Sequence, residues 1–161
     1  MRFFVFRAAK GEVIVTMDAD IQNDPKDIPL LLEALKENDV ACGWRWQRND
    51  PGIKKISSKI ANGVRNWLNK EEIHDTGCSL KAFRREVIMR FKLFNGMHRF
   101  FPTLAKMEGF RVTEVKVNHR QRQFGKTKYG VWNRIFRALS DAFAVRWMQK
   151  RALRYQLEEG A

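Results

Sequence analysis

Hydrophobic and polar positions follow two different periods along the chain, and each period predicts a different kind of element. Residues 12–17 (EVIVTM) form a β-branched, mostly apolar run that is typical of a buried strand. Residues 39–43 (DVACG) predict a second short strand, and the near-alternating valines within residues 110–119 predict a third.

Three other segments place apolar residues at helical spacing. Asp24 stands before Pro25 as an N-cap before a first helical turn, with Asp27 near the positive helix end, and the leucines up to residue 35 continue this helix. A second stripe runs along residues 53–68, and a third marks a long amphipathic, basic helix over residues 131–154. Strands that alternate with helices predict an α/β fold with at least part of a parallel sheet.

The composition is that of an ordinary globular domain. The chain has 161 residues, of which 44% are hydrophobic and 30% charged, enough for one domain with a core. Its apolar runs fall short of the roughly 20 residues that cross a bilayer, and its first residues lack the long apolar region of a signal peptide. Cys42 and Cys78 lie outside any CxxC pattern, which favours reduced thiols in a cytosolic protein, and three scattered histidines argue against a zinc site.

Positive charge is concentrated toward the end of the sequence. The formal net charge is +13, and residues 119–154 contain ten Lys or Arg against one acid, Asp141. A segment of this kind predicts a phosphate-bearing partner, which can be a nucleic acid, a nucleotide or an anionic membrane surface. Charge alone does not choose among the three.

Two acids stand at the predicted carboxyl end of the first strand, where open α/β sheets bind ligands. At their spacing, Asp18 and Asp20 can both reach one divalent cation, and Mg²⁺ usually takes one or two carboxylates together with substrate phosphates. The competing interpretation is that acids after a strand only form turns and caps. That interpretation suits Asp24 and Asp27, which begin the next helix, better than it suits Asp18 and Asp20.

Several segments resemble one enzyme family in the same order. They are TMDADIQNDPKDIPLLL (16–32), GWRWQRND (43–50), IHDTGCSLKAFRREV (73–87) and a long segment from Asn95 to Gly130 that ends in HRQRQFGKTKYG. Together they resemble family 2 glycosyltransferases, in the branch of dolichol-phosphate mannosyltransferase and bacterial undecaprenyl-phosphate glycosyltransferases. The resemblance runs from about Gly11 to Trp147, and Thr127 stands where the family more often has Ser.

This resemblance implies a partial GT-A fold, which is Rossmann-like, with helices on a mixed, mainly parallel sheet. It implies transfer of a sugar from a nucleotide-sugar to a polyprenyl phosphate or another acceptor, with Mg²⁺ or Mn²⁺ held by Asp18, Asp20 and Gln22. The acceptor side is implied at His98 and Arg99, although His98 suits a packed or capping role equally well. The implied donor- or acceptor-phosphate ligands are Arg45, Arg48, Arg120, Arg122, Lys126 and Lys128, for which a solvated basic surface is the alternative.

Asp75 is the candidate catalytic residue, within the turn-like stretch His74-Asp-Thr-Gly77. If the acceptor is a hydroxyl, the Asp75 carboxylate can remove its proton as a general base. If the acceptor is a phosphate, which is already ionised at neutral pH, Asp75 orients other groups instead. The structural alternative is an ordinary Asp-Thr-Gly turn.

The family begins with a nucleotide-binding half, whereas only about ten residues precede Gly11 here. The expectation is therefore a single, N-terminally truncated domain over residues 1–161, with activity of the isolated chain in question and with an oligomer or a complementing chain as partner. The helix over residues 131–154 either lies on an anionic membrane, which places the protein peripherally on the cytoplasmic membrane face, or packs on its own sheet.

Two other function classes stay open. A basic nucleic-acid-binding module would account for the charge and the aromatic content, but the chain carries no helix-turn-helix, zinc-finger or RNP-type signature. An inactive remnant that only docks on a membrane or a partner would show itself through an exposed sheet edge.

Overall fold

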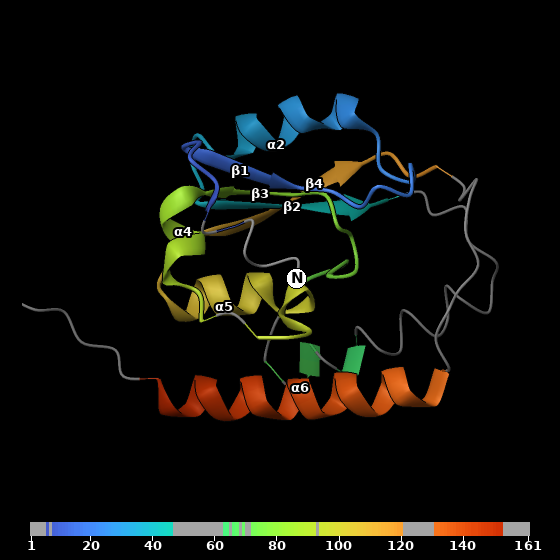
Figure 1. Cartoon of the computed structure of the whole chain (residues 1–161), viewed down its shortest axis with the longest axis vertical. Coiled ribbons are helices and arrows are strands. Elements are labelled where there is room, and N and C mark those ends of the chain that lie inside the picture. The colour runs from blue at the N-terminus through green and yellow to red at the C-terminus, as the bar shows by residue number, and fades with distance from the viewer. Residues whose placement is uncertain are drawn as a thin grey trace, which may run out of the picture.

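A four-stranded sheet forms the centre of the molecule (Figure 1). The structure is a computed structural model that describes residues 6, 8–46, 63–64, 66–67, 69, 72–92, 94–120 and 131–152. The strands are β1 (Val13–Thr16), β2 (Val40–Arg45), β3 (Lys81–Arg84) and β4 (Val112–Val117), in the spatial order β1-β3-β2-β4. The three strands predicted from the sequence are β1, β2 and β4, and all three are confirmed.

The sheet is mixed, as expected, but its parallel part is small. Among the strands that the structure describes, only β2 and β4 pair in parallel, whereas β3 lies antiparallel between β1 and β2. The strands β1, β2 and β4 therefore share one direction, and the inserted β3 makes two of the three pairings antiparallel. The sequence pattern missed β3 because KAFR is only four residues long and carries a lysine and an arginine.

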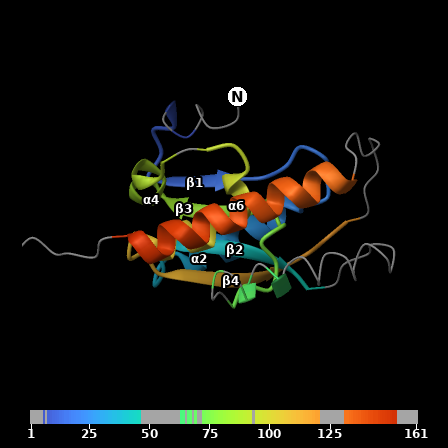
Figure 2. The ribbon, with the colours of Figure 1, turned by 90° about the horizontal axis from the view of Figure 1, so that it is seen from below.

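Helices lie on both faces of the sheet, and a further helix forms an outer layer (Figures 1 and 2). The 3₁₀ turn η1 (Pro25–Asp27) and α2 (Ile28–Ala34) cover one face. The opposite face carries α4 (Arg85–Arg90), the 3₁₀ turn η2 (Met97–Arg99) and α5 (Phe101–Met107). The long helix α6 (Val131–Arg151) lies beyond α5.

The helix start predicted at Asp24 is confirmed, because the Lys26 N–H donates to the Asp24 carboxylate at 3.1 Å. Behind it, Leu31 and Leu35 are buried between α2 and the sheet, while Leu32 is 42% exposed. The predicted stripe therefore holds only on the side that faces the sheet. The helix predicted over residues 53–68 lies largely outside the described residues.

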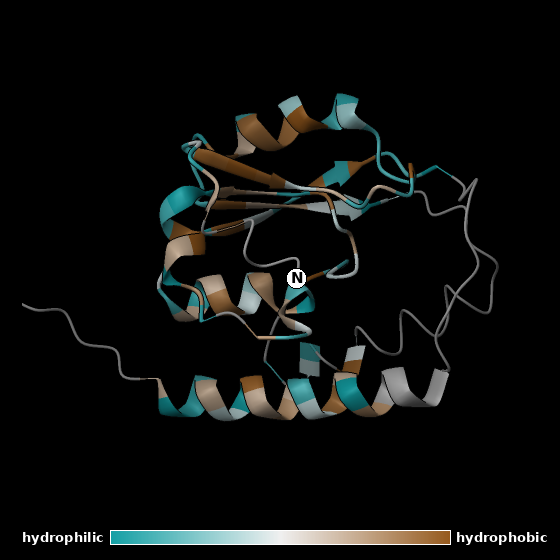
Figure 3. Cartoon of the chain, in the orientation of Figure 1, coloured by the Kyte–Doolittle hydropathy of each residue, from teal (hydrophilic) through white to brown (hydrophobic). Residues whose placement is uncertain are grey.

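Among the described residues, three apolar clusters hold the layers together. Figure 3 shows apolar residues, in brown, on the strands and on the helices at both faces of the sheet. One cluster lies between α2 and the sheet, and a second lies between the sheet and the helices α4 and α5. The third joins Phe100 to Ala142 and Val145 of α6. Helix α6 therefore packs on the η2–α5 layer, so the interpretation that it packs directly on the sheet is wrong.

Candidate functional site

The candidate residues gather where β1, β2 and β4 end, because these strands share one direction. Asp18 and Asp20 follow β1, Arg45 ends β2, and His119 and Arg120 follow β4. The loop of residues 75–79 leads into β3 at the same edge. Open α/β sheets bind ligands at the carboxyl ends of their strands, so the topology assembles a site where such folds place one.

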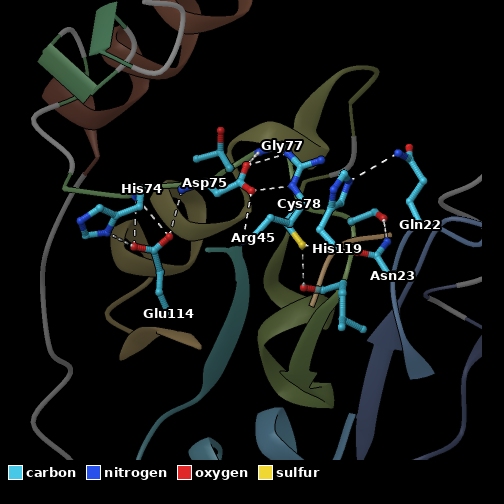
Figure 4. A network of polar contacts seen from close by, with 12 residues as sticks. Gln22, Asn23, Arg45, His74, Asp75, Gly77, Cys78, Glu114 and His119 are labelled. Carbon is cyan, nitrogen blue, oxygen red and sulfur yellow. Dashed lines mark hydrogen bonds and ion pairs between the residues drawn. The ribbon is translucent and has the colours of Figure 1, made fainter. Parts of the chain in front are cut away.

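The best-defined contact of this edge is a two-pronged ion pair between Arg45 and Asp75 (Figure 4). The Arg45 Nε donates to Asp75 Oδ2 at 2.6 Å, and Nη2 donates to Oδ1 at 2.9 Å. The Gly77 N–H donates to the same Oδ1 at 3.1 Å. Because the side chains of Arg45 and Asp75 are only 15% and 4% exposed, the carboxylate is fixed and the guanidinium plane is oriented.

Glycine at position 77 leaves room for the close approach of this pair. A β-carbon on Gly77 would lie 3.1 Å from Arg45 Nη2 and 3.4 Å from Asp75 Oδ1. The absent side chain thus lets the guanidinium reach the turn. Asp75 and Arg45 are candidates from separate sequence motifs, and the structure brings them into direct contact.

The acidic segment after β1 is tied to the same loop. The hydroxyl of Ser79 accepts hydrogen bonds from the Asp18 N–H at 3.1 Å and from the Asn23 side chain at 2.8 Å. Asp18 is exposed, whereas Asp20 and Gln22 are half-buried.

Between Asp20 and Gln22, Ile21 has a φ of 62°, which a β-branched residue rarely adopts. This turn lets the Gln22 N–H donate to Asp20 Oδ1 at 3.3 Å. Among the described residues, no group of three or more His, Cys, Asp or Glu is placed to hold a metal ion.

The segment that follows β4 crosses to the acidic segment. His119 forms an isolated β-bridge with Asn23, and the His119 Nε2 lies 3.4 Å from the side-chain nitrogen of Gln22. The Arg120 backbone N–H donates to the Gln22 backbone carbonyl at 2.9 Å. The guanidinium of Arg120 forms an ion pair with Asp24. The Lys26 N–H and then Arg120 hold the pKa of Asp24 below its usual value. Arg120 thus lies beside the candidate metal residues but is engaged by the helix cap.

His98 and Arg99 belong to η2, next to α6, with His98 exposed and Arg99 half-buried. Gly96, which precedes η2, has a φ of 97°, and a β-carbon there would lie 2.5 Å from Asp141 Oδ2 of α6. The candidate phosphate ligands Arg48, Arg122, Lys126 and Lys128 lie outside the described residues.

Glu114 on β4 belongs to this site, although no sequence motif indicated it. Its carboxylate accepts from the backbone N–H groups of His74 and Asp75 at 3.0 and 3.1 Å, and it lies 2.8 Å from His74 Nδ1. Trp44 stacks on the His74 ring at 4.2 Å. These contacts hold the start of the 75–79 loop against β2 and β4. A glutamate within the alternating valines of β4 was the available signal.

Comparison with known proteins agrees with this arrangement. Residues 2–91 match the family model of glycosyl transferase family 2. Dodecaprenyl-phosphate galacturonate synthase of Rhizobium johnstonii is 39% identical over 94% of this chain and 45% of its own length. Undecaprenyl-phosphate 4-deoxy-4-formamido-L-arabinose transferase of Aeromonas hydrophila is 36% identical over 81% of this chain and 40% of its own length. The chain thus spans less than half the length of these curated relatives.

The fold has counterparts among solved structures. Glucosyl-3-phosphoglycerate synthase from Mycobacterium tuberculosis, in complex with Mn²⁺, UDP-glucose and glycerol 3-phosphate, superposes with a TM-score of 0.62 at 12% identity. The superposition covers 95% of this chain and 55% of that chain.

None of the helices in the described part of the chain is long and apolar enough to cross a membrane. With more than half of its residues matched by the family model, the chain belongs to glycosyl transferase family 2.

Proposed function

We propose that this chain is a glycosyltransferase domain that takes a sugar from a nucleotide-sugar and transfers it to a prenyl phosphate. The observation that carries the proposal is the oriented Arg45–Asp75 pair at the carboxyl edge of the sheet, tied through Ser79 to the Asp18–Asp20 segment. The two curated relatives are named for transfer to dodecaprenyl and undecaprenyl phosphate, which supports this acceptor class.

On the donor side, Asp18, Asp20 and Gln22 are the proposed residues for Mg²⁺ or Mn²⁺. Their oxygen atoms are the ligands that these hard cations prefer. A cation at this position supplies charge that offsets the negative charge developing on the leaving nucleoside diphosphate. Because Mg²⁺ usually takes one or two carboxylates together with substrate phosphates, the donor diphosphate completes the proposed ligand set, and metal and nucleotide are expected to bind together.

On the acceptor side, Arg45 is the proposed ligand of the prenyl phosphate, because a guanidinium matches phosphate oxygens two at a time. Both Asp75 oxygens already accept hydrogen bonds. A phosphate acceptor needs no base, so Asp75 acts by orienting Arg45 rather than by taking a proton. The further proposed phosphate ligands are Arg48, Arg120, Arg122, Lys126 and Lys128. His98 and Arg99 are proposed to lie on the acceptor side.

A lipid-linked acceptor implies contact with a membrane surface, and α6 offers the surface for it. Phe136, Phe143 and Trp147 are 67%, 61% and 63% exposed and recur at intervals of seven and four residues, which places them on one side of the helix. Ala142 and Val145 pack the other side against the η2–α5 layer. Exposed aromatic residues with Arg137 and Lys150 beside them suit a helix that lies on an anionic surface.

The test of the donor side is calorimetric titration of the chain with UDP and GDP, each with and without Mn²⁺. We expect binding that requires Mn²⁺ and is abolished by Asp20→Asn, which keeps the size of the side chain but removes its charge. Glu33→Gln, an exposed acid on α2, is the matched control and is expected to bind as the wild type does. Metal-independent binding, or unchanged binding in Asp20→Asn, would contradict the proposed metal site.

A further inference from the structure

Lys81 is a buried basic residue within the site that the proposed transfer reaction does not use. It begins β3 and is only 2% exposed. Its Nζ donates to the Thr76 carbonyl at 3.3 Å and, at shorter range, to the Cys78 carbonyl. A buried ammonium group is costly unless its N–H groups find oxygen atoms, and these two carbonyls serve that purpose.

The hydrogen bonds of the Lys81 ammonium group go to backbone carbonyls rather than to a carboxylate. Its neighbours across the sheet are Thr16 on β1 and Cys42 on β2. Burial raises the pKa of the Cys42 thiol to about 12, so this group is neutral at physiological pH. Burial also raises the pKa of the Cys78 thiol. Lys81 is thus stabilised by backbone carbonyls, and a methionine of similar length would fill the same space without the cost of burying an amine.

The two carbonyls belong to the turn that presents Asp75. Thr76 and Cys78 stand on either side of Gly77, whose N–H holds the Asp75 carboxylate and whose missing side chain admits Arg45. The Thr76 carbonyl and the Gly77 N–H belong to one planar peptide group. A side chain that holds this carbonyl and that of Cys78 therefore also fixes the direction of the Gly77 N–H. The position of the Asp75 carboxylate, and with it the plane of the Arg45 guanidinium, therefore depends on this turn (Figure 4).

We propose that Lys81 is a positioning residue for the phosphate site: by holding the carbonyls of Thr76 and Cys78 it sets the turn through which Asp75 orients Arg45. Lys81 contacts neither substrate in this proposal and acts through the turn. The assignment rests on the proposed function only where it names the prenyl phosphate as the ligand of Arg45. The hydrogen bonds that link Lys81 to Arg45 through the turn and Asp75 are present in the folded chain without any substrate.

The first test is spectroscopic and needs no substrate. In ¹H–¹⁵N spectra of the chain, the Arg45 Nε–H, assigned by its loss in Arg45→Lys, should be shifted and protected from exchange because it is bonded to Asp75. We expect Lys81→Met to shift this signal toward that of a solvated arginine and to speed its exchange. Lys81→Arg keeps a cation with N–H donors at this position, so its Arg45 Nε–H signal should resemble that of the wild type.

The second test is binding of farnesyl phosphate, a soluble short prenyl phosphate. Lys81→Met is expected to weaken its binding by about tenfold or more, since an unfixed guanidinium loses its paired contact with phosphate. Binding of UDP with Mn²⁺ should change little, because the segment that carries Asp20 meets the loop where Asp18 and Asn23 bond to Ser79, and not at Lys81. Lys36→Met, which removes an exposed lysine, is the charge-matched control.

An unchanged Arg45 signal in a folded Lys81→Met variant would overturn the assignment. If Lys81→Met does not fold, Lys81→Gln, which is shorter and neutral but still polar, takes its place with the same expected loss. A wild-type chain that binds no prenyl phosphate would contradict the proposed acceptor, and the Arg45 signal would still decide the role of Lys81.

Discussion

At the scale of single residues, the acidic segment after β1 contains carboxylates with different tasks. Asp24 caps η1 and pairs with Arg120, and Asp27 is buried, where it accepts hydrogen bonds from the backbone and side chain of Asn118 at 2.7 and 2.8 Å. The cap predicted at Asp24 is thus confirmed, whereas Asp27 makes no side-chain cap hydrogen bond and holds Asn118 instead.

The cap at Asp24 should make part of the stability depend on pH. Because its pKa is lower in the folded chain than the ordinary value of 3.8, its contribution is fully present above that value and is lost as the pH falls through the lower, folded pKa. Asp24→Asn keeps the cap but loses the charge. Urea unfolding should show wild type more stable than Asp24→Asn at pH 7, with the difference shrinking below pH 3.8.

Glu33→Gln, which disrupts the exposed pair with Lys36, is the control for this pH series and should change the unfolding free energy little at either pH. A constant difference between Asp24→Asn and wild type from pH 7 to pH 2.5 would show that the charge of Asp24 carries none of the stability.

At the scale of elements, the strands β1, β2 and β4 and the capped start of α2 were predictable, and the helices α4 and α5 were not. The strands β1 and β4 contain runs or alternations of β-branched residues, and β2 begins with a short apolar run. The helices α4 and α5 have only six and seven residues and, unlike the turn that leads into the equally short α2, begin without a side-chain cap. Their helical state depends on burial against the sheet rather than on local preference.

The contact between η2 and α6 gives a prediction about Gly96. Gly96 and Gly109 both have positive φ, 97° and 87°, but only at Gly96 would a β-carbon meet another side chain, that of Asp141. Gly109→Ala should cost about 1 kcal/mol of unfolding free energy for the backbone conformation alone. Gly96→Ala should cost clearly more in urea unfolding, because Asp141 must also move.

Adding Asp141→Ala to Gly96→Ala should recover the excess over Gly109→Ala and leave the backbone cost. Burial raises the pKa of Asp141, so its ionised form is disfavoured in the folded chain and its removal is not expected to destabilise strongly at pH 7. Equal losses of unfolding free energy for the two glycine variants would mean that Asp141 on α6 can move away from residue 96 without cost.

At the scale of the whole molecule, the layers give α6 two different sides. One side closes the cluster around Phe100, and the other presents aromatic residues outward. The net charge of +13 favours an anionic partner for this surface. Binding to a lipid surface would hold the η2–α5 layer, and with it His98 and Arg99, near the head groups.

The double variant Phe143→Ser, Trp147→Ser should therefore bind vesicles of phosphatidylglycerol and phosphatidylcholine at least about tenfold more weakly than wild type in a sedimentation assay. Leu30→Ser, which removes an exposed apolar residue from α2, is the matched control and should bind as wild type does. Vesicles of phosphatidylcholine alone should bind all variants weakly. Equal binding by the double variant would place the lipid contact elsewhere or exclude it.

The sequence by itself determined the family, the strands β1, β2 and β4, the capped helix start at Asp24 and the acids at the end of β1. These features depend on neighbouring residues, so local pattern and motif suffice to recognise them. Only the tertiary structure decided that Asp75 orients Arg45, that Lys81 supports their turn and that α6 packs on α5. Such contacts join residues that are far apart in the chain, and burial and direction, which no local pattern encodes, decide which of them meet.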